Sequence, residues 1–327
     1  MYLLRFDMRL DERGAPADEM YRAALEMTEW ADDHDCMVVA FSEHHGSPDG
    51  YLPAPTVMAA AAVARTRKVP IQVAALLAAL HHPVQMAEEL AVLDILSGGR
   101  VSYVLGLGYR PEEFDLYGVP MDQRGARLEA AVGVLRRAWA GEPVARDDGS
   151  AGEVRVTPLP LTPGGPLLLM GGGTPAAARR AARLGLGMIT ERTGDLEQHY
   201  VEACRALGKE PGMFVGGGDA TVVATFVDHD PDAAWERLGP FLLHDARAYA
   251  QWNVGAAKPL PGAVVDVRTV EDVRAAGRYR VYTPDEAAEH VRTSGPLVLH
   301  PLCGGTPPDL GWSTLHLLAD EVLPQLG

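Results

Sequence analysis

A carboxylate and two imidazoles stand together in the segment Ser42-Glu43-His44-His45-Gly46, directly after a short apolar run. An imidazole with its ordinary pKa of about 6.5 can take or give a proton at neutral pH. The segment therefore indicates proton-transfer chemistry. The alternative is a surface loop whose histidines do no chemistry. A carboxylate beside two histidines at a predicted strand end favours the chemical interpretation.

A glycine-rich turn, Gly171-Gly172-Gly173-Thr174-Pro175, precedes a predicted helix. The glycines free the backbone, Thr174 can cap the helix, and Pro175 suits its first position. Unpaired amides at the positive end of a helix dipole attract anions, and phosphate is the natural guest. The alternative is a tight turn without a ligand. A Walker loop is excluded because no lysine follows the glycines.

Two further predicted strand ends carry small or flexible residues. Ala74 and Ala75 would let a planar ligand approach the backbone, although core packing explains them better on sequence alone. The segment Gly106-Leu107-Gly108-Tyr109-Arg110 permits a tight loop with exposed amides. It falls short of a dinucleotide fingerprint, because no third glycine opens a helix and no acidic residue follows at the right distance.

Other classes of site find little support in the sequence. It has no serine nucleophile elbow and no His-Glu-x-x-His helix. The pairs His44/His45 and His81/His82 could belong to a barrel metallohydrolase, but no convincing set of further ligands accompanies them, so no metal is predicted. A net charge of -15 and a lysine count of only three argue against nucleic acid and anionic membranes as partners.

The expected location is the cytoplasm. Residues 1–7 lack the charged region and long apolar run of a signal peptide. The longest apolar stretch, 73–80, is too short to span a bilayer. The three cysteines lie far apart and form no metal pattern, and such an odd, sparse count suits a reducing compartment.

Short apolar runs alternate with longer helical patterns along the 327 residues, which favours a parallel α/β sheet. The predicted strands cover residues 3–6, 36–41, 69–77, 101–105, 167–170, 186–190, 221–227 and 297–300. The predicted helices cover 18–34, 53–65, 83–96, 123–139, 175–184, 196–207, 284–293 and 312–323, and one more starts at 232. Eight strands favour a closed (β/α)8 TIM barrel, whose chemistry gathers at the C-terminal strand ends. We expect one domain over 1–327, with a hairpin insertion at 141–166 and an irregular one at 255–282.

Several sequence blocks, in a fixed order, resemble the luciferase-like monooxygenase family, which includes bacterial luciferase and deazaflavin-dependent oxidoreductases. No single block suffices, but the order is specific and covers about residues 3–186, with a weaker match at 283–323. The blocks are Glu43-His44-His45; Pro55 with the helix to Arg65; Val73-Ala74-Ala75; His82-Pro83-Val84 with Glu88; Leu93-Asp94-x-Leu96-Ser97-Gly98-Gly99-Arg100; the Gly106 loop with Glu113-Phe114; Arg124 with the helix to Trp139; and Gly171 to Thr174.

This resemblance implies a barrel that binds FMN or its deazaflavin relative. His44 would be the catalytic acid/base, with Glu43 and His45 supporting it. Ala74-Ala75 matches the place of a non-proline cis peptide beneath the flavin ring. The residues Gly171, Gly172, Gly173 and Thr174 match the region that holds the cofactor phosphate.

The chain also departs from luciferase in the loop after the fourth predicted strand. Leu107 stands where luciferase has a phosphate-binding arginine, and Gly106 stands where it has a reactive thiol. We therefore expect no light emission from a long aldehyde. The segment Gly108-Tyr109-Arg110 is more similar to members that use either cofactor, and Arg110 is expected to supply the missing positive charge.

The expected function is a monooxygenase that uses reduced FMN, supplied by a separate flavin reductase, and oxygen to oxidise a small organic substrate. One alternative is a deazaflavin-dependent oxidoreductase, in which His44 would handle the proton that accompanies hydride transfer. Another is a flavin-binding protein without turnover, against which the presence of His44 argues. The resemblance also implies a homodimer packed through the helix near 53–64. The substrate is not identified, since 46–52 and 255–282, expected to line its pocket, carry no recognisable chemistry.

Overall fold

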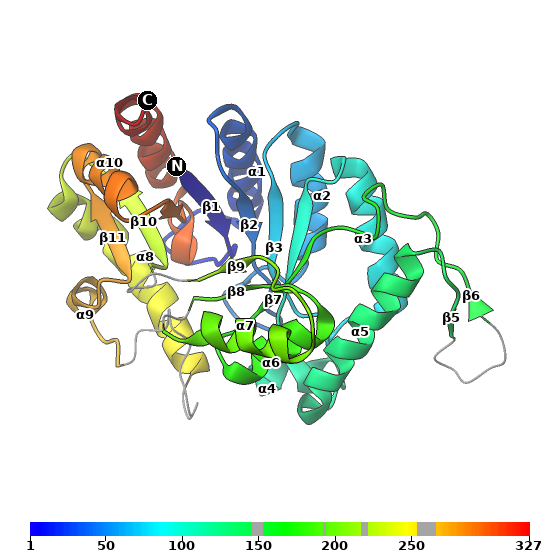
Figure 1. Cartoon of the computed structure of the whole chain (residues 1–327). Coiled ribbons are helices and arrows are strands. Elements are labelled where there is room, and N and C mark those ends of the chain that lie inside the picture. The colour runs from blue at the N-terminus through cyan, green and yellow to red at the C-terminus, as the bar shows by residue number, and fades with distance from the viewer. Residues whose placement is uncertain (146–152, 192–193, 217–221, 254–265) are drawn as a thin grey trace. The chain divides into compact units, whose positions relative to one another are not determined.

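The computed structural model describes residues 1–145, 153–191, 194–216, 222–253 and 266–327 (Figure 1). These residues form two compact units. Unit 1 combines Met1–Pro53 with Gly217–Gly327, and unit 2 is Ala54–Gly216. Among the described residues, each unit contains one parallel sheet with its own helices.

The sheet of unit 1 has the strand order β11-β10-β12-β1-β2, with every pair parallel. Its strands are β1 (Tyr2–Phe6), β2 (Val39–Phe41), β10 (Ala224–Val227), β11 (Tyr279–Tyr282) and β12 (Leu297–Leu299). In β1 the alternate residues Tyr2, Leu4 and Phe6 are fully buried, as expected for a strand with one face on a core. Because all five strands run the same way, their carboxyl ends lie at one edge of this sheet.

The helices of unit 1 begin at residues suited to capping. Thr283 and Glu286 form a capping box, with Pro284 in the first turn. Asp230 accepts the backbone N–H groups of Asp232 and Ala233. The helices are α1 (Ala17–Asp33), α8 (Pro231–Trp252), α9 (Val270–Ala275), α10 (Pro284–Thr293) and α11 (Pro308–Leu317), with short turns η2 (Cys303–Gly305), η3 (Leu318–Val322) and η4 (Leu323–Gln325).

The sheet of unit 2 has the order β3-β4-β7-β8-β9, again with parallel pairs. Its strands are β3 (Ile71–Leu76), β4 (Val101–Leu105), β7 (Leu168–Gly171), β8 (Gly187–Ile189) and β9 (Phe214–Val215). A separate antiparallel pair joins β5 (Val144–Ala145) to β6 (Glu153–Val154). Because β3, β4 and β7 are adjacent and parallel, their carboxyl ends are neighbours at one edge of the five-stranded sheet of unit 2.

Two helices of unit 2 end where glycine allows a left-handed residue. Gly98 and Gly185 have φ of 65° and 61°, and they close α3 and α6. The indole N–H of Trp139 donates to the carbonyl of Ala87 at 3.0 Å and ties α5 to α3. The helices are α2 (Pro55–Arg65), α3 (Pro83–Ser97), α4 (Pro111–Leu116), α5 (Arg124–Trp139), α6 (Pro175–Leu184) and α7 (Leu196–Ala206), with the turn η1 (Met121–Gln123).

All eight predicted strands are present, with boundaries that differ by a few residues at most. The hairpin predicted within 141–166 is confirmed as the β5–β6 pair. The prediction of an irregular segment at 255–282 is wrong for its described part, which holds α9 and β11. The strand β9 was also not predicted, because two residues are too short to show a period. None of the described helices has the length and apolar character that crossing a membrane requires.

Candidate active site

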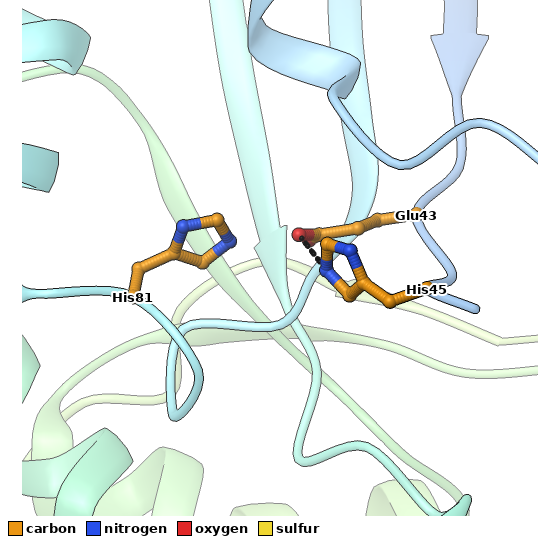
Figure 2. A group of neighbouring side chains, drawn as sticks. All are labelled: Glu43, His45 and His81. Atoms are coloured by element: carbon orange, nitrogen blue, oxygen red, sulfur yellow. Dashed lines mark hydrogen bonds and ion pairs between the residues drawn. The ribbon is translucent and has the colours of Figure 1, made fainter. Parts of the chain in front are cut away.

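The loop that follows β2 carries three buried titratable side chains. Glu43, His44 and His45 are 2%, 7% and 4% exposed. Nε2 of His45 lies 2.9 Å from Oε1 of Glu43, as Figure 2 shows; His81, also drawn there, belongs to unit 2. The backbone N–H of His44 donates to the carbonyl of Leu52 at 3.1 Å. These side chains are therefore buried and not solvent-exposed, and the Glu43 carboxylate is a hydrogen-bond partner of the His45 ring.

The imidazole of His44 is packed against two aromatic rings of unit 1. Its centroid lies 4.8 Å from that of Tyr51, with the planes at 78°. The Trp252 ring lies 4.7 Å away at 56°. Tyr51 comes from the same loop, whereas Trp252 is the last residue of α8. His44 is therefore held by two elements that lie far apart in the sequence.

A buried ionic cluster follows the first strand. Asp7 and Arg9 are both fully buried. Nε of Arg9 lies 2.9 Å from Oδ1 of Asp245 and 3.6 Å from Oδ2 of Asp7, and its Nη1 pairs with Asp49. Met8, between the two charged residues, has φ of 61°, which is uncommon for a residue other than glycine. Sequence reasoning missed this cluster, because the Asp-x-Arg pattern after the first predicted strand does not show that Arg9 also pairs with Asp49 and Asp245.

The carboxylates of this cluster have further partners that set their ionisation. Burial alone would raise the pKa of Asp7, but His300 and Arg9 outweigh it and hold that pKa at about 2. Burial of Asp49 is likewise outweighed, by His244 and Arg9, so its pKa is lowered. The hydrogen bond with Asp49 raises the pKa of His244. Asp7, Arg9 and Asp49 thus stabilise one another in their charged forms.

We expect the folded protein to lose about 2 kcal/mol of stability as the pH falls from about 4 to about 2 through Asp7 alone. The pKa of Asp7 is about 2 in the folded state, against an ordinary value of 3.8. Ionised Asp7 therefore stabilises the fold above pH 3.8, and this contribution disappears as the pH falls through the folded pKa. Urea unfolding at a series of acidic pH values measures it. Asp7→Asn should flatten the profile, whereas the exposed Asp18→Asn should follow the wild type; a parallel profile for Asp7→Asn would contradict the assignment.

In unit 2, the peptide bond between Ala74 and Ala75 is cis, as the sequence resemblance implied. It lies within β3, and the pairing register with β4 shifts between Ala74 and Leu76. A Cβ on Gly106 would lie 2.8 Å from the Cβ of Ala75. Glycine at the end of β4 is therefore required for the close approach of these two strand ends.

The loop after β4 continues through Leu107, Gly108 and Tyr109, which are all partly exposed. Arg110 is buried, and its Nη1 lies 3.4 Å from Oε1 of Glu113. The positive charge of Arg110, which is expected to bind the cofactor phosphate, is thus partly balanced by the carboxylate of Glu113 in α4.

The turn after β7 has the form that its glycines and threonine predict. Thr174 caps α6, with its Oγ1 accepting the backbone N–H of Ala177 at 3.2 Å. Gly172 has φ of 137°, in a region that L side chains rarely adopt. A Cβ on Gly171 would lie 3.0 Å from Val104 and 3.3 Å from the carbonyl oxygen of Leu105. This turn is therefore packed against the end of β4.

The predicted cofactor residues of unit 2 are thus brought to neighbouring strand ends. Ala74-Ala75 lies near the end of β3, the Gly106 loop follows β4, and the Gly171 turn begins at the end of β7. The three predicted proton-transfer residues lie together in unit 1 after β2. The structure thus gives the positions of the predicted cofactor-binding and proton-transfer residues, and their roles stay predictions.

Parallel strands that alternate with helices, with titratable and glycine-rich segments after the strand ends, are the features of an α/β fold of the barrel class. Residues 3–295 match the model of the family described as luciferase-like monooxygenase, and the chain belongs to that family. It is therefore an oxidoreductase, and both the family and the (β/α)8 fold class predicted from the sequence are confirmed.

Known proteins of similar sequence and fold agree with this assignment. The α chain of alkanal monooxygenase from Photorhabdus luminescens is 28% identical over 208 residues, which cover 62% of this chain and 57% of that relative. The crystal structure of a monooxygenase from Streptomyces bottropensis is 26% identical with a TM-score of 0.77, and the match covers 100% of both chains.

Two more distant solved structures share the fold. One is the oxygenating constituent of 3,6-diketocamphane monooxygenase from Pseudomonas putida in complex with FMN, with a TM-score of 0.70 at 16% identity, covering 100% of this chain and 99% of that one. The other is an F420-dependent secondary alcohol dehydrogenase, with a TM-score of 0.67 at 19% identity, covering 100% of this chain and 99% of that one.

Proposed function

We propose that this protein is a monooxygenase that uses reduced FMN and oxygen to oxidise a small organic substrate. The observation that carries the proposal is the absence of side-chain bulk where β3, β4 and β7 end in unit 2. There, Ala75 abuts Gly106, and Gly171 abuts the backbone of Leu105. Membership of the luciferase-like monooxygenase family supports the reaction class.

The residues at these strand ends fit a planar, phosphate-bearing cofactor. A Cβ at Gly106 would lie 2.8 Å from the Cβ of Ala75, so only glycine lets these two strand ends lie this close together. Gly172 and Thr174 precede α6, whose N-terminal dipole favours an anion. We infer that Ala74 and Ala75 support the ring and that the Gly171 turn holds the phosphate, with Leu107, Gly108, Tyr109 and Arg110 lining the loop between them.

The flavin supplies the redox chemistry with oxygen, and the protein supplies binding, orientation and proton control. In this proposal His44 holds and moves the proton at its imidazole. Glu43 would accept the N–H of His45 and so fix the orientation of that ring. The burial of all three side chains keeps water away from the proton that they handle.

The proposal includes the setting in which the enzyme works. A separate reductase delivers the reduced flavin, and the enzyme acts in the cytoplasm as a homodimer. The proposed dimer contact is the Ala-rich helix α2, as the resemblance to the family implies. Sedimentation of the purified protein tests the dimer, and a monomer at micromolar concentration would contradict it.

A deazaflavin-dependent hydride transfer is the second candidate, because an F420-dependent dehydrogenase shares the fold to nearly the same extent as the FMN-bound monooxygenase. Fluorescence titration with FMN and with the deazaflavin, each in oxidised and reduced form, separates the candidates. Preference for reduced FMN supports oxygen activation. Preference for the deazaflavin overturns the leading proposal in favour of hydride transfer. Failure to bind either would contradict both.

We expect Gly106→Ala to weaken cofactor binding about tenfold, which corresponds to about 1.4 kcal/mol. The added methyl would come within 2.8 Å of the Ala75 Cβ and force the two strand ends apart. Gly133→Ala is the matched control, because a Cβ there meets nothing within 4 Å. The dissociation constant of the preferred cofactor is the measurement. Equal affinity in the two variants would show that the Gly106 surface does not contact the cofactor.

A further inference from the structure

Arg9 stacks on aromatic side chains as well as pairing with carboxylates. Its guanidinium carbon lies 4.4 Å from the ring centroid of Trp252, 4.7 Å from that of Tyr51 and 4.8 Å from that of Tyr249. A planar guanidinium lies flat on ring faces in a way that a compact ammonium does not. The positions of these three rings therefore depend on the position of the Arg9 guanidinium.

The guanidinium is held by side chains that are themselves fixed. Asp245, which pairs with its Nε, also accepts the hydroxyl of Tyr279 at 2.7 Å. Asp7 lies 3.3 Å from Nε2 of His300. The carboxylates neutralise the charge of Arg9 inside the protein, so the structure offers this cation as a support and not as a site for an anionic ligand.

Two of the three rings that Arg9 contacts are the rings that contact His44. Tyr51 meets the imidazole at 4.8 Å and Trp252 meets it at 4.7 Å, and the two rings lie 5.7 Å apart. Arg9 and His44 thus share both rings as neighbours. A displacement of the Arg9 guanidinium would therefore move the Tyr51 and Trp252 rings, and with them the His44 imidazole.

The third ring braces the other two. The hydroxyls of Tyr249 and Tyr51 lie 3.1 Å apart, and the Arg5 guanidinium donates to the Tyr249 hydroxyl at 3.1 Å. The Tyr249 ring also meets Trp252 edge-on at 5.3 Å. The aromatic group therefore forms one connected unit around the Arg9 cation.

We propose that Arg9 is a positioning residue for His44, acting through Tyr51 and Trp252. This inference rests on the acid/base role proposed above for His44. A purely structural ionic cluster would stabilise the fold but leave the imidazole in place when the cation is altered mildly. The two interpretations therefore differ in what happens to His44 in a folded variant.

The test is the NMR spectrum of protein labelled with ¹³C-histidine, comparing the wild type with Arg9→Lys. Lysine keeps the charge for the carboxylates but replaces the guanidinium, whose carbon lies 4.4–4.8 Å from the three ring centroids, by a compact ammonium group. We expect the His44 ring signals, assigned by their loss in His44→Asn, to move toward the positions of an unstacked imidazole, because the ring currents of Tyr51 and Trp252 no longer act at a fixed geometry.

The spectrum contains its own controls. His34 stacks on Trp30 at 4.0 Å, and His316 stacks on Trp312 at 5.7 Å. Neither histidine contacts Tyr51 or Trp252, so their signals should stay unchanged. Arg22→Lys, an exposed substitution of the same kind, should leave the His44 signals in place.

A second variant covers the case in which Arg9→Lys does not fold. Arg9→Gln combined with Asp245→Asn removes the cation and one of its carboxylates together, which reduces the charge left unpaired. It should also shift the His44 signals. If either folded variant leaves these signals in their wild-type positions, Arg9 does not position His44 and the inference is overturned.

Steady-state kinetics give a second readout. We expect Arg9→Lys to lower kcat about tenfold or more with little change in KM, because a small misplacement of a catalytic group weakens the chemical step more than binding. If His44→Ala keeps full turnover, the proposed function fails for His44. The NMR shift would then still decide whether Arg9 positions the ring, so the two failures are distinguishable.

Discussion

His44→Ala should reduce turnover about 10²- to 10⁴-fold while the cofactor still binds, since this is the range that one positioned acid/base contributes. The imidazole is 7% exposed and packed between Tyr51 and Trp252, so another side chain has no ready access to its place. Single-turnover measurement with pre-bound reduced cofactor separates the chemical step from binding. A loss in turnover with an unchanged dissociation constant is the expected result.

The control for this experiment is His316→Ala. That imidazole also has an indole neighbour, on which it stacks at 5.7 Å from Trp312, but it is exposed on α11. Its removal should leave turnover unchanged. Wild-type turnover in His44→Ala would contradict the acid/base role and would revive the interpretation of flavin binding without proton control by this residue. Loss of cofactor binding and turnover together would indicate a structural role for the imidazole.

Elements with chemical markers at both ends could be predicted closely. The helix α6 was predicted at its exact bounds, because Thr174 and Pro175 mark its start and Gly185 its end. The helix α10 was likewise exact, with Thr283 and Pro284 at its start. The strand β4 stands between Gly99 and Gly106, and its five residues matched as well. In each case local residues fix the boundary without help from distant packing.

Elements without such markers were predicted less well. The strand β11 lies in a segment that was expected to be irregular, and its place depends on parallel pairing with β10, more than fifty residues earlier in the sequence. By contrast, α11 does have such a marker, since Pro308 stands in its first turn, and the prediction of a helix from residue 312 missed it. Long-range pairing leaves little trace in local composition.

In the candidate site, too, some residues could be predicted from the sequence and others could not. Glu43, His44 and His45 could be recognised because they are adjacent in the sequence and stand at a strand end. Arg9 could not, since its partners are spread over residues 7, 49–51 and 245–252 and only the fold brings them together. A buried charge is recognised by its partners, and partners that lie this far apart along the chain have no sequence spacing to read.

The second large effect concerns this buried charge. Arg9→Met should lower the free energy of unfolding by about 3–5 kcal/mol, the usual result of removing one partner from a buried ion pair. The methionine would leave the carboxylates of Asp7, Asp49 and Asp245 in the core without the cation that pairs with them. Against a typical total of about 5–15 kcal/mol, such a loss removes a large part of the stability. Urea unfolding at neutral pH measures it.

Arg22→Met is the matched control, because Arg22 is 58% exposed and pairs with an exposed Asp18. Its effect should stay below about 1 kcal/mol, as for other surface ion pairs. A double-mutant cycle then tests the cause. Asp245→Asn should destabilise the wild type, since it weakens a pair with Nε of Arg9 at 2.9 Å, but it should cost less or even stabilise in the Arg9→Met background, where it removes one unpaired carboxylate. Equal effects of Asp245→Asn in both backgrounds would mean that the destabilisation by Arg9→Met comes from lost ring packing, and the ionic explanation would be wrong.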